Sequence, residues 1–179
     1  MDRTLRLLGV LLLTAVAGCA QHSTPPIPAT SASAATGPTP PSSPSRPQPL
    51  GTSQTLTDPG LALDVTVFTV EQNLLPDTAG PAGGGHWAAA DAQTCLRQSG
   101  TDFTVGWGDW SVSDGTTQYP ASTARLGEFP IPQFPTGPES IAVGECTRGW
   151  VVFAVGYGAD VTTVRYRPAA RSPLVWSAS

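Results

Sequence analysis

The sequence predicts an all-β fold, an antiparallel β-sandwich of seven or eight short strands that carries one disulfide. Three observations support this prediction. From residue 54 onward, short runs of β-forming side chains alternate with turns rich in Gly and Pro. No window of twelve residues shows the 3.6-residue period of an amphipathic helix. Two cysteines, Cys95 and Cys146, lie in the same part of the chain.

The individual strands are predicted from short stretches of apolar and β-branched side chains. Residues 61–67 alternate apolar with polar side chains, which is the period of a half-buried strand. Residues 88–92 (Ala-Ala-Ala-Asp-Ala) also have helical propensity, but we predict a strand because it would bring Cys95 into a sheet. Turns are predicted at residues 83–85, 114–115 and 156–159. The other strands are predicted at residues 87–95, 103–112, 117–119, 141–143, 150–155, 161–167 and 174–176.

The first 18 residues have the pattern of a secretory signal peptide. Arg3 and Arg6 form a positive n-region, and residues 7–17 are mostly apolar. A membrane-spanning helix needs about 20 apolar residues, so this run is too short to span a bilayer. Its length is instead that of the apolar core of a signal peptide. Residues 1–18 are therefore predicted to be removed on export.

The signal segment ends in Val16-Ala17-Gly18-Cys19, which resembles the bacterial lipobox. The resemblance implies that the Cys19 thiol receives a diacylglyceryl group and that cleavage follows Gly18. Two acyl chains give stable anchoring where one chain gives only marginal binding. The predicted partner is thus the membrane, reached through a lipid anchor at the extracellular face of the cell membrane. An ordinary signal peptide followed by an incidental cysteine is the alternative.

Residues 19–53 are predicted to be a disordered linker that starts at the lipidated cysteine. The segment is rich in Pro, Ser, Thr and Ala and has no side chains from which to build a core. Such a linker would hold the predicted β-sandwich domain, residues 54–179, away from the membrane. A domain of this size buries enough apolar surface to fold alone.

Assigning Cys19 to the lipid leaves Cys95 and Cys146 as one pair. An exported pair is expected to form a disulfide, and closing a loop of about fifty residues stabilises the fold by roughly 4 kcal/mol. A redox-active pair would usually show close CxxC spacing, which is absent. The order Cys95, Trp107, Cys146 is that of immunoglobulin domains, but Gly144 stands where their tyrosine is expected. Because Cys146 precedes its apolar run, the bridge is expected to join strand ends.

Residues 143–155 (Val-Gly-Glu-Cys-Thr-Arg-Gly-Trp-Val-Val-Phe-Ala-Val) resemble a turn and strand of immunoglobulin-like (Ig-like) domains. These domains occur in actinobacterial cell-surface lipoproteins and in the mycobacterial immunoprotective extracellular antigen family. Residues 110–115, a strand leading into a turn, fit the same pattern. The resemblance covers roughly residues 61–176 and implies an Ig-like β-sandwich outside the cell. It implies no established enzymatic activity and supplies no catalytic residues.

Composition excludes several kinds of chemistry. All nine basic residues are Arg, so a Walker-type phosphate loop and Schiff-base catalysis through lysine are excluded. With a net charge of −4 and scattered arginines, no nucleic-acid partner is expected. No cofactor or metal is expected either, because His86 is isolated and Asp109 and Asp114 lack the spacing of a calcium loop. No catalytic residue is predicted, although paired carboxylates distant in sequence are an enzymatic alternative.

The five tryptophans suggest a binding surface. Trp107 and Trp110 are three positions apart, so in a regular strand their side chains would point to opposite faces and one ring would face outward. Trp110 is therefore the candidate ligand contact, unless a bulge at Gly106 or Gly108 changes its facing. The predicted function is a membrane-anchored extracytoplasmic lipoprotein that displays an Ig-like binding domain to a protein or cell-wall partner. The alternative is a carbohydrate-binding module for cell-wall glycans.

Overall fold

The computed structural model describes residues 46–76, 79–168 and 171–178, which belong to a folded unit spanning Ser42–Ser179. The predicted signal peptide, Cys19 and most of the predicted linker lie outside the described residues. No helix within the described ranges is long and apolar enough to cross a membrane.

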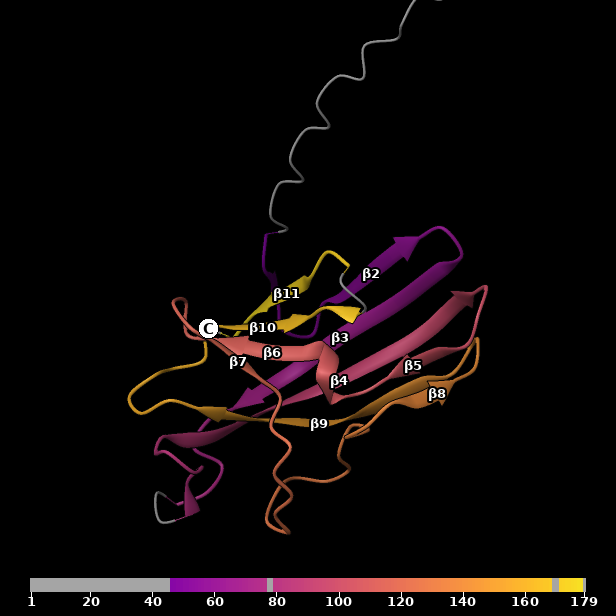
Figure 1. Ribbon diagram of the computed structural model, residues 1–179. Helices are drawn as coiled ribbons and strands as arrows, with labels where there is room; N and C mark the ends of the chain where they lie inside the picture. The colour runs from indigo at the N-terminus through magenta and orange to yellow at the C-terminus, as the bar shows by residue number, and fades with distance from the viewer. Residues whose placement is uncertain (1–45, 77–78, 169–170, 179) are drawn as a thin grey trace, which may run out of the picture. The chain divides into compact units, whose positions relative to one another are not determined.

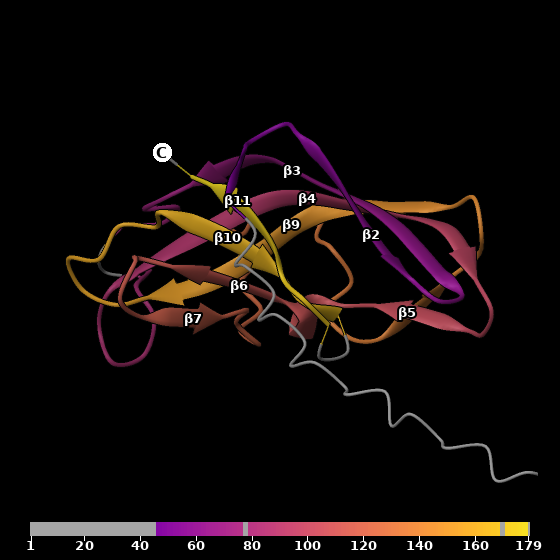
Figure 2. The same cartoon turned by 90° about the horizontal axis from the view of Figure 1, so that it is seen from above.

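The fold is a β-sandwich of two main sheets, which confirms the predicted fold class (Figure 1). One sheet contains, in spatial order, β2 (Ser53–Asp58), β3 (Leu61–Glu71), β4 (His86–Ser99) and β9 (Cys146–Val155). The other contains β1 (Gln48–Pro49), β11 (Leu174–Ser177), β10 (Thr163–Tyr166), β6 (Trp110–Ser113) and β7 (Gln118–Pro120). A separate pair is formed by β5 (Phe103–Val105) and β8 (Glu139–Ile141). Figure 2 shows the same arrangement from above.

The central strand β4 resolves the ambiguity of the alanine run in favour of a strand. It pairs with β3 on one side and with β9 on the other. Ala89 and Ala90 point to opposite faces of the sheet, yet both are fully buried. On the face opposite the core, Arg148 donates two hydrogen bonds to Asp91, and its guanidinium lies 3.9 Å from the centre of the Phe68 ring. Burial on both faces explains why this strand lacks a polar alternation.

The folded unit begins before the predicted boundary between residues 53 and 54. Strand β1 pairs in parallel with β11, and the Gly51 amide donates to the Val67 carbonyl. The Trp176 indole donates to the carbonyl of Thr52 at 2.8 Å. The proline content of this stretch is compatible with β1 because the strand is only two residues long and lies at a sheet edge. Residues 48–53, predicted as linker, therefore belong to the fold.

The predicted disulfide is confirmed and lies within one sheet. Cys95 of β4 and Cys146 of β9 are directly opposed in the ladder, with their Cα atoms 4.0 Å apart. Cys146 is the first residue of its strand, so the bridge joins neighbouring strands near one end of the sheet. It does not cross between the two sheets, as the bridge of antibody domains does.

Candidate functional site

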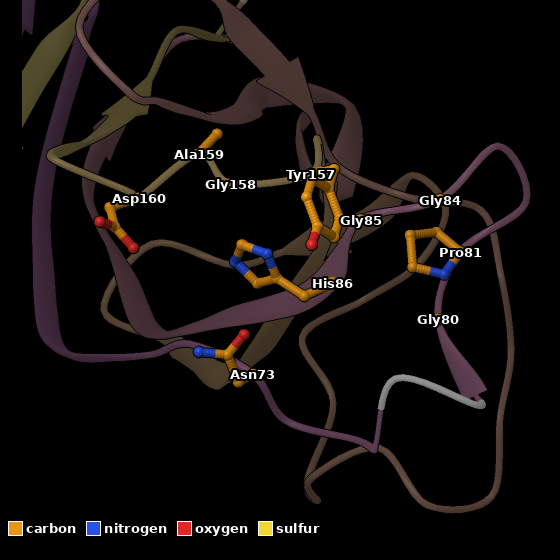
Figure 3. A pocket seen from close by; sticks show the side chains of 10 residues that line it. All are labelled: Asn73, Gly80, Pro81, Gly84, Gly85, His86, Tyr157, Gly158, Ala159 and Asp160. Carbon is orange, nitrogen blue, oxygen red and sulfur yellow. The ribbon is translucent and has the colours of Figure 1, made fainter.

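A pocket of about 610 Å³ lies at the end of the sandwich away from the disulfide (Figure 3). His86 pairs with Val155 at this end of the β4–β9 ladder, whereas Cys95 pairs with Cys146 near the other. The walls of the pocket come from the segment between β3 and β4 and from the loop after β9. Loops grouped at the end of a β-sandwich form the ligand-binding surface in variable immunoglobulin domains.

Glycine at position 85 lets the two walls approach each other. Gly85 has φ +104°, and a Cβ atom on it would collide with the backbone carbonyl oxygen of Val155. A larger residue at this position would therefore push the loop off the sheet. The opposite loop is a tight turn closed by a 3.2 Å hydrogen bond from the Ala159 amide to the Gly156 carbonyl. The turns predicted at residues 83–85 and 156–159 thus become the facing walls of one site.

Three further hydrogen bonds hold these loops against the sandwich. The Val161 amide donates to Gln72 Oε1 at 2.9 Å, which ties the two walls to each other. The Leu74 amide donates to the Trp87 carbonyl at 3.0 Å. The buried Trp87 indole in turn donates to the Ala79 carbonyl at 2.8 Å. The pocket is therefore largely formed before any ligand arrives.

Four polar or aromatic side chains line this pocket: Asn73, His86, Tyr157 and Asp160 (Figure 3). Tyr157 is 95% exposed, and Asn73 and Asp160 are also exposed. His86 is half-buried, and its Nε2 atom has no hydrogen-bond partner within the described part of the chain. No arginine lines the pocket, so its walls carry one carboxylate and no fixed positive charge.

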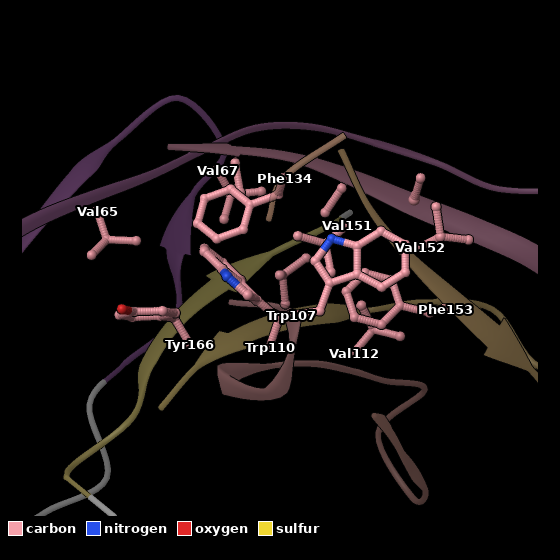
Figure 4. Packing of buried hydrophobic residues seen from close by; sticks show 14 of the residues in the cluster. Val65, Val67, Trp107, Trp110, Val112, Phe134, Val151, Val152, Phe153 and Tyr166 are labelled. Carbon is pink, nitrogen blue, oxygen red and sulfur yellow. The ribbon is translucent and has the colours of Figure 1, made fainter. Parts of the chain in front are cut away.

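The expectation that Trp110 is a ligand contact is wrong. Its side chain is 1% exposed and lies in the core against Tyr166 and Phe134, with ring centres 4.6 Å and 5.8 Å away (Figure 4). The strand predicted at residues 103–112 is interrupted by a 3₁₀ turn, Trp107–Asp109. Residues three apart share a face of a 3₁₀ turn, so Trp107 and Trp110 both point inward.

The exposed aromatic residue at the pocket is Tyr157, which the sequence analysis of the tryptophans does not identify. A usable signal is present in the sequence, because Tyr157 stands between Gly156 and Gly158 in a predicted turn. An aromatic residue without apolar neighbours at a turn has nothing to pack against. His86, which is isolated in the sequence, begins β4 and lines the pocket.

Asp114 serves a structural role in the hairpin between β6 and β7. Its carboxylate accepts hydrogen bonds from the amides of Thr117 (2.6 Å) and Thr116 (2.8 Å) and from the Tyr119 hydroxyl (2.8 Å). These donors hold the pKa of Asp114 well below its ordinary range. Gly115 follows with φ +99°, as expected for the predicted Asp-Gly turn. Within the described ranges, no group of three or more His, Cys, Asp and Glu side chains is placed to hold a metal ion.

Burial raises the pKa of the Asp109 carboxyl from an ordinary value of 3.8 to about 6. Between about pH 4 and 6 the unfolded chain loses this proton before the folded chain does, so stability falls as the pH rises. The Asp109→Asn variant is expected to be more stable than the wild type at pH 7.5 by about 1 kcal/mol, discounted because the carboxyl is partly solvated. Near pH 4 the two proteins should become equally stable. Urea unfolding at pH 7.5 and at pH 4 measures the difference in unfolding free energy between the variant and the wild type. The same difference at both pH values would contradict the prediction.

No protein-family model and no curated protein matches this sequence. The fold is similar to the crystal structure of MPT63, a secreted protein from Mycobacterium tuberculosis, with a TM-score of 0.57. The similarity covers 76% of this chain and 98% of the MPT63 chain, at 18% sequence identity. At this identity the likeness shows the fold alone. It agrees with the Ig-like β-sandwich that the resemblance implied.

Proposed function

We propose that the protein is an extracytoplasmic lipoprotein, anchored through Cys19, that displays its Ig-like domain as a binding module. The observation that carries the proposal is that two of the three cysteines pair with each other and the third ends the apolar amino-terminal segment. Cys95 and Cys146 form the disulfide, which leaves Cys19 at the end of the apolar segment. A lipid anchor requires a cysteine at this position, and Cys19 is not part of the Cys95–Cys146 bridge.

Two observations support a location outside the cytoplasm. Disulfides persist in oxidising compartments and are rare where thiols are kept reduced. The structurally similar MPT63 is described as a secreted protein. The lipid would hold the domain at the extracellular face of the membrane.

The pocket supports binding as the role of the domain. Its side chains are presented by two tethered loops at one end of a rigid sandwich. The partner proposed is a protein or a component of the cell wall. A nucleic acid is not proposed, because the net charge is −4 and no arginine lines the pocket.

The Cys19→Ser variant tests the anchor. Wild-type protein is expected in the membrane fraction, extractable only with detergent, because two acyl chains make attachment stable. The variant should leave that fraction and appear in the medium, since a hydroxyl group does not accept the lipid. The neighbouring Ala20→Ser substitution keeps the thiol and should stay with the membrane. Fractionation and the mass of the mature amino terminus measure the outcome; a membrane-bound Cys19→Ser protein would refute the anchor.

A further inference from the structure

We propose that the pocket binds an uncharged saccharide, with Tyr157 stacking on a sugar ring and Asn73, His86 and Asp160 hydrogen-bonding its hydroxyl groups. This inference rests on the proposed binding role of the domain and names the ligand class of its site. It replaces the buried Trp110 with a different aromatic contact, on another loop.

Tyr157 provides the apolar part of the site. Its ring is 95% exposed, and the neighbours Gly156 and Gly158 have no side chains that would cover its faces. One exposed aromatic residue on a protein surface needs no special explanation. This one stands at the mouth of a 610 Å³ pocket, where three polar side chains face the same space (Figure 3). A saccharide ring matches that combination, because it has a face of C–H groups and an edge of hydroxyls.

The polar side chains can form hydrogen bonds with the hydroxyl groups of a saccharide. The Asn73 amide both donates and accepts, whereas the Asp160 carboxylate accepts only. A hydroxyl group also donates and accepts, so it can satisfy either partner. His86 lines the pocket with a half-buried imidazole, whose Nε2 atom is itself buried and unpaired within the described residues. Asn73, Tyr157 and Asp160 are exposed and make no side-chain hydrogen bond to another described residue, so these three groups are available to a ligand.

Charge and size narrow the ligand class further. A phosphate or carboxylate ligand is disfavoured, because no arginine lines this pocket and the Asp160 carboxylate would repel it. A small cation such as a quaternary ammonium group would suit Tyr157 and Asp160, but it would leave Asn73 and His86 without a role. The volume of 610 Å³ lies within the range of about 300–1,000 Å³ that is typical of ligand sites. A neutral ring with several hydroxyls uses all four side chains.

The fixed loops favour binding by lowering its entropic cost. The bond from Val161 to Gln72 and the bond from Trp87 to Ala79 hold the two walls in the free protein. A ligand therefore need not order both loops when it binds.

Binding is tested with the detergent-solubilised full chain on an array of chitotriose, mannotriose, maltotriose and acidic trigalacturonic acid. Calorimetric titration follows for the trisaccharides bound, with choline as the cationic comparison. At least one neutral trisaccharide should bind, and Tyr157→Ala should weaken it about tenfold or more. Tyr157→Phe should keep the affinity within about threefold, because the ring remains. Asp160→Asn should weaken binding about fivefold, because a carboxylate is the stronger acceptor.

Matched controls lie on a different loop. Ile131 is 81% exposed and Glu128 is exposed, and neither lines the pocket, so Ile131→Ala and Glu128→Gln should bind like the wild type. The saccharide assignment is overturned if no neutral trisaccharide binds, if choline or trigalacturonic acid binds in their place, or if Tyr157→Ala binds unchanged. The titration does not depend on the anchor. If no saccharide bound but Cys19→Ser released the protein into the medium, the saccharide assignment would fail and the proposed display function would still hold.

Discussion

Replacing Trp110 with alanine is expected to lower the free energy of unfolding by about 4 kcal/mol, because it removes the central ring of an aromatic cluster. The Trp110 ring lies 4.6 Å from that of Tyr166, 5.8 Å from that of Phe134 and 6.4 Å from that of Trp176. All four side chains are at most 1% exposed, so the surrounding sheets cannot collapse into the cavity without moving each other. Urea unfolding followed by circular dichroism measures the loss.

Two control variants separate packing from chemistry at this position. Trp110→Phe keeps an aromatic ring and removes an indole Nε1 that has no hydrogen-bond partner among the described residues, so it should cost less than half as much. Tyr157→Ala removes an aromatic ring that is 95% exposed and should change stability by less than about 0.5 kcal/mol. If Trp110→Ala were as stable as Tyr157→Ala, the ring could not lie in the core, and the ligand contact first expected there would regain support.

Removing the disulfide with the double substitution Cys95→Ser and Cys146→Ser is expected to lower the free energy of unfolding by about 4 kcal/mol. The bridge closes a loop between residues that are 51 positions apart, so its loss returns considerable conformational freedom to the unfolded chain. The loop contains β5 to β8 and the 3₁₀ turn that precedes Trp110, so two strands of the five-stranded sheet lie within it. Denaturation in urea, with the wild type measured under oxidising and reducing conditions, gives the difference.

Cys19→Ser is the matched control for the disulfide, because it removes a cysteine that is not part of the Cys95–Cys146 bridge. Its unfolding free energy should equal that of the wild type. Reduced wild type should lose as much stability as the double variant. Equal stability of the oxidised wild type and the double variant would show that the bridge contributes nothing.

Some features were predictable because they depend on local pattern or on counting. The alternation at residues 61–67 predicted part of β3, since strand side chains alternate between two faces whatever their neighbours. Cys95 and Cys146 had only each other to pair with once Cys19 was set aside. The turn at Asp114 and Gly115 was predictable because it depends on the identity of two adjacent residues.

Other features could not be predicted because they depend on how strands pair. Strand β1 forms by pairing with β11, which is adjacent in the sheet but more than a hundred residues later in the sequence. Trp110 points inward because a three-residue 3₁₀ turn precedes it. Counting odd and even positions along an assumed strand does not reveal such a turn. The alanine run of β4 is buried on both faces, a condition that alternation cannot show.

By itself, the sequence determined the β class of the domain, its cysteine pairing and the resemblance of the segment ending at Cys19 to a lipobox. Those features need only neighbouring residues or a count of residue types. The tertiary structure alone decided where a ligand could bind. Asn73 and Asp160 are far apart in the chain, and the pairing of β3, β4 and β9 brings their loops to one end of the sandwich. Strand pairing, which is a property of the assembled sheet, thus built the pocket. The 3₁₀ turn Trp107–Asp109 turned Trp110, the ligand contact expected from the sequence, into the core.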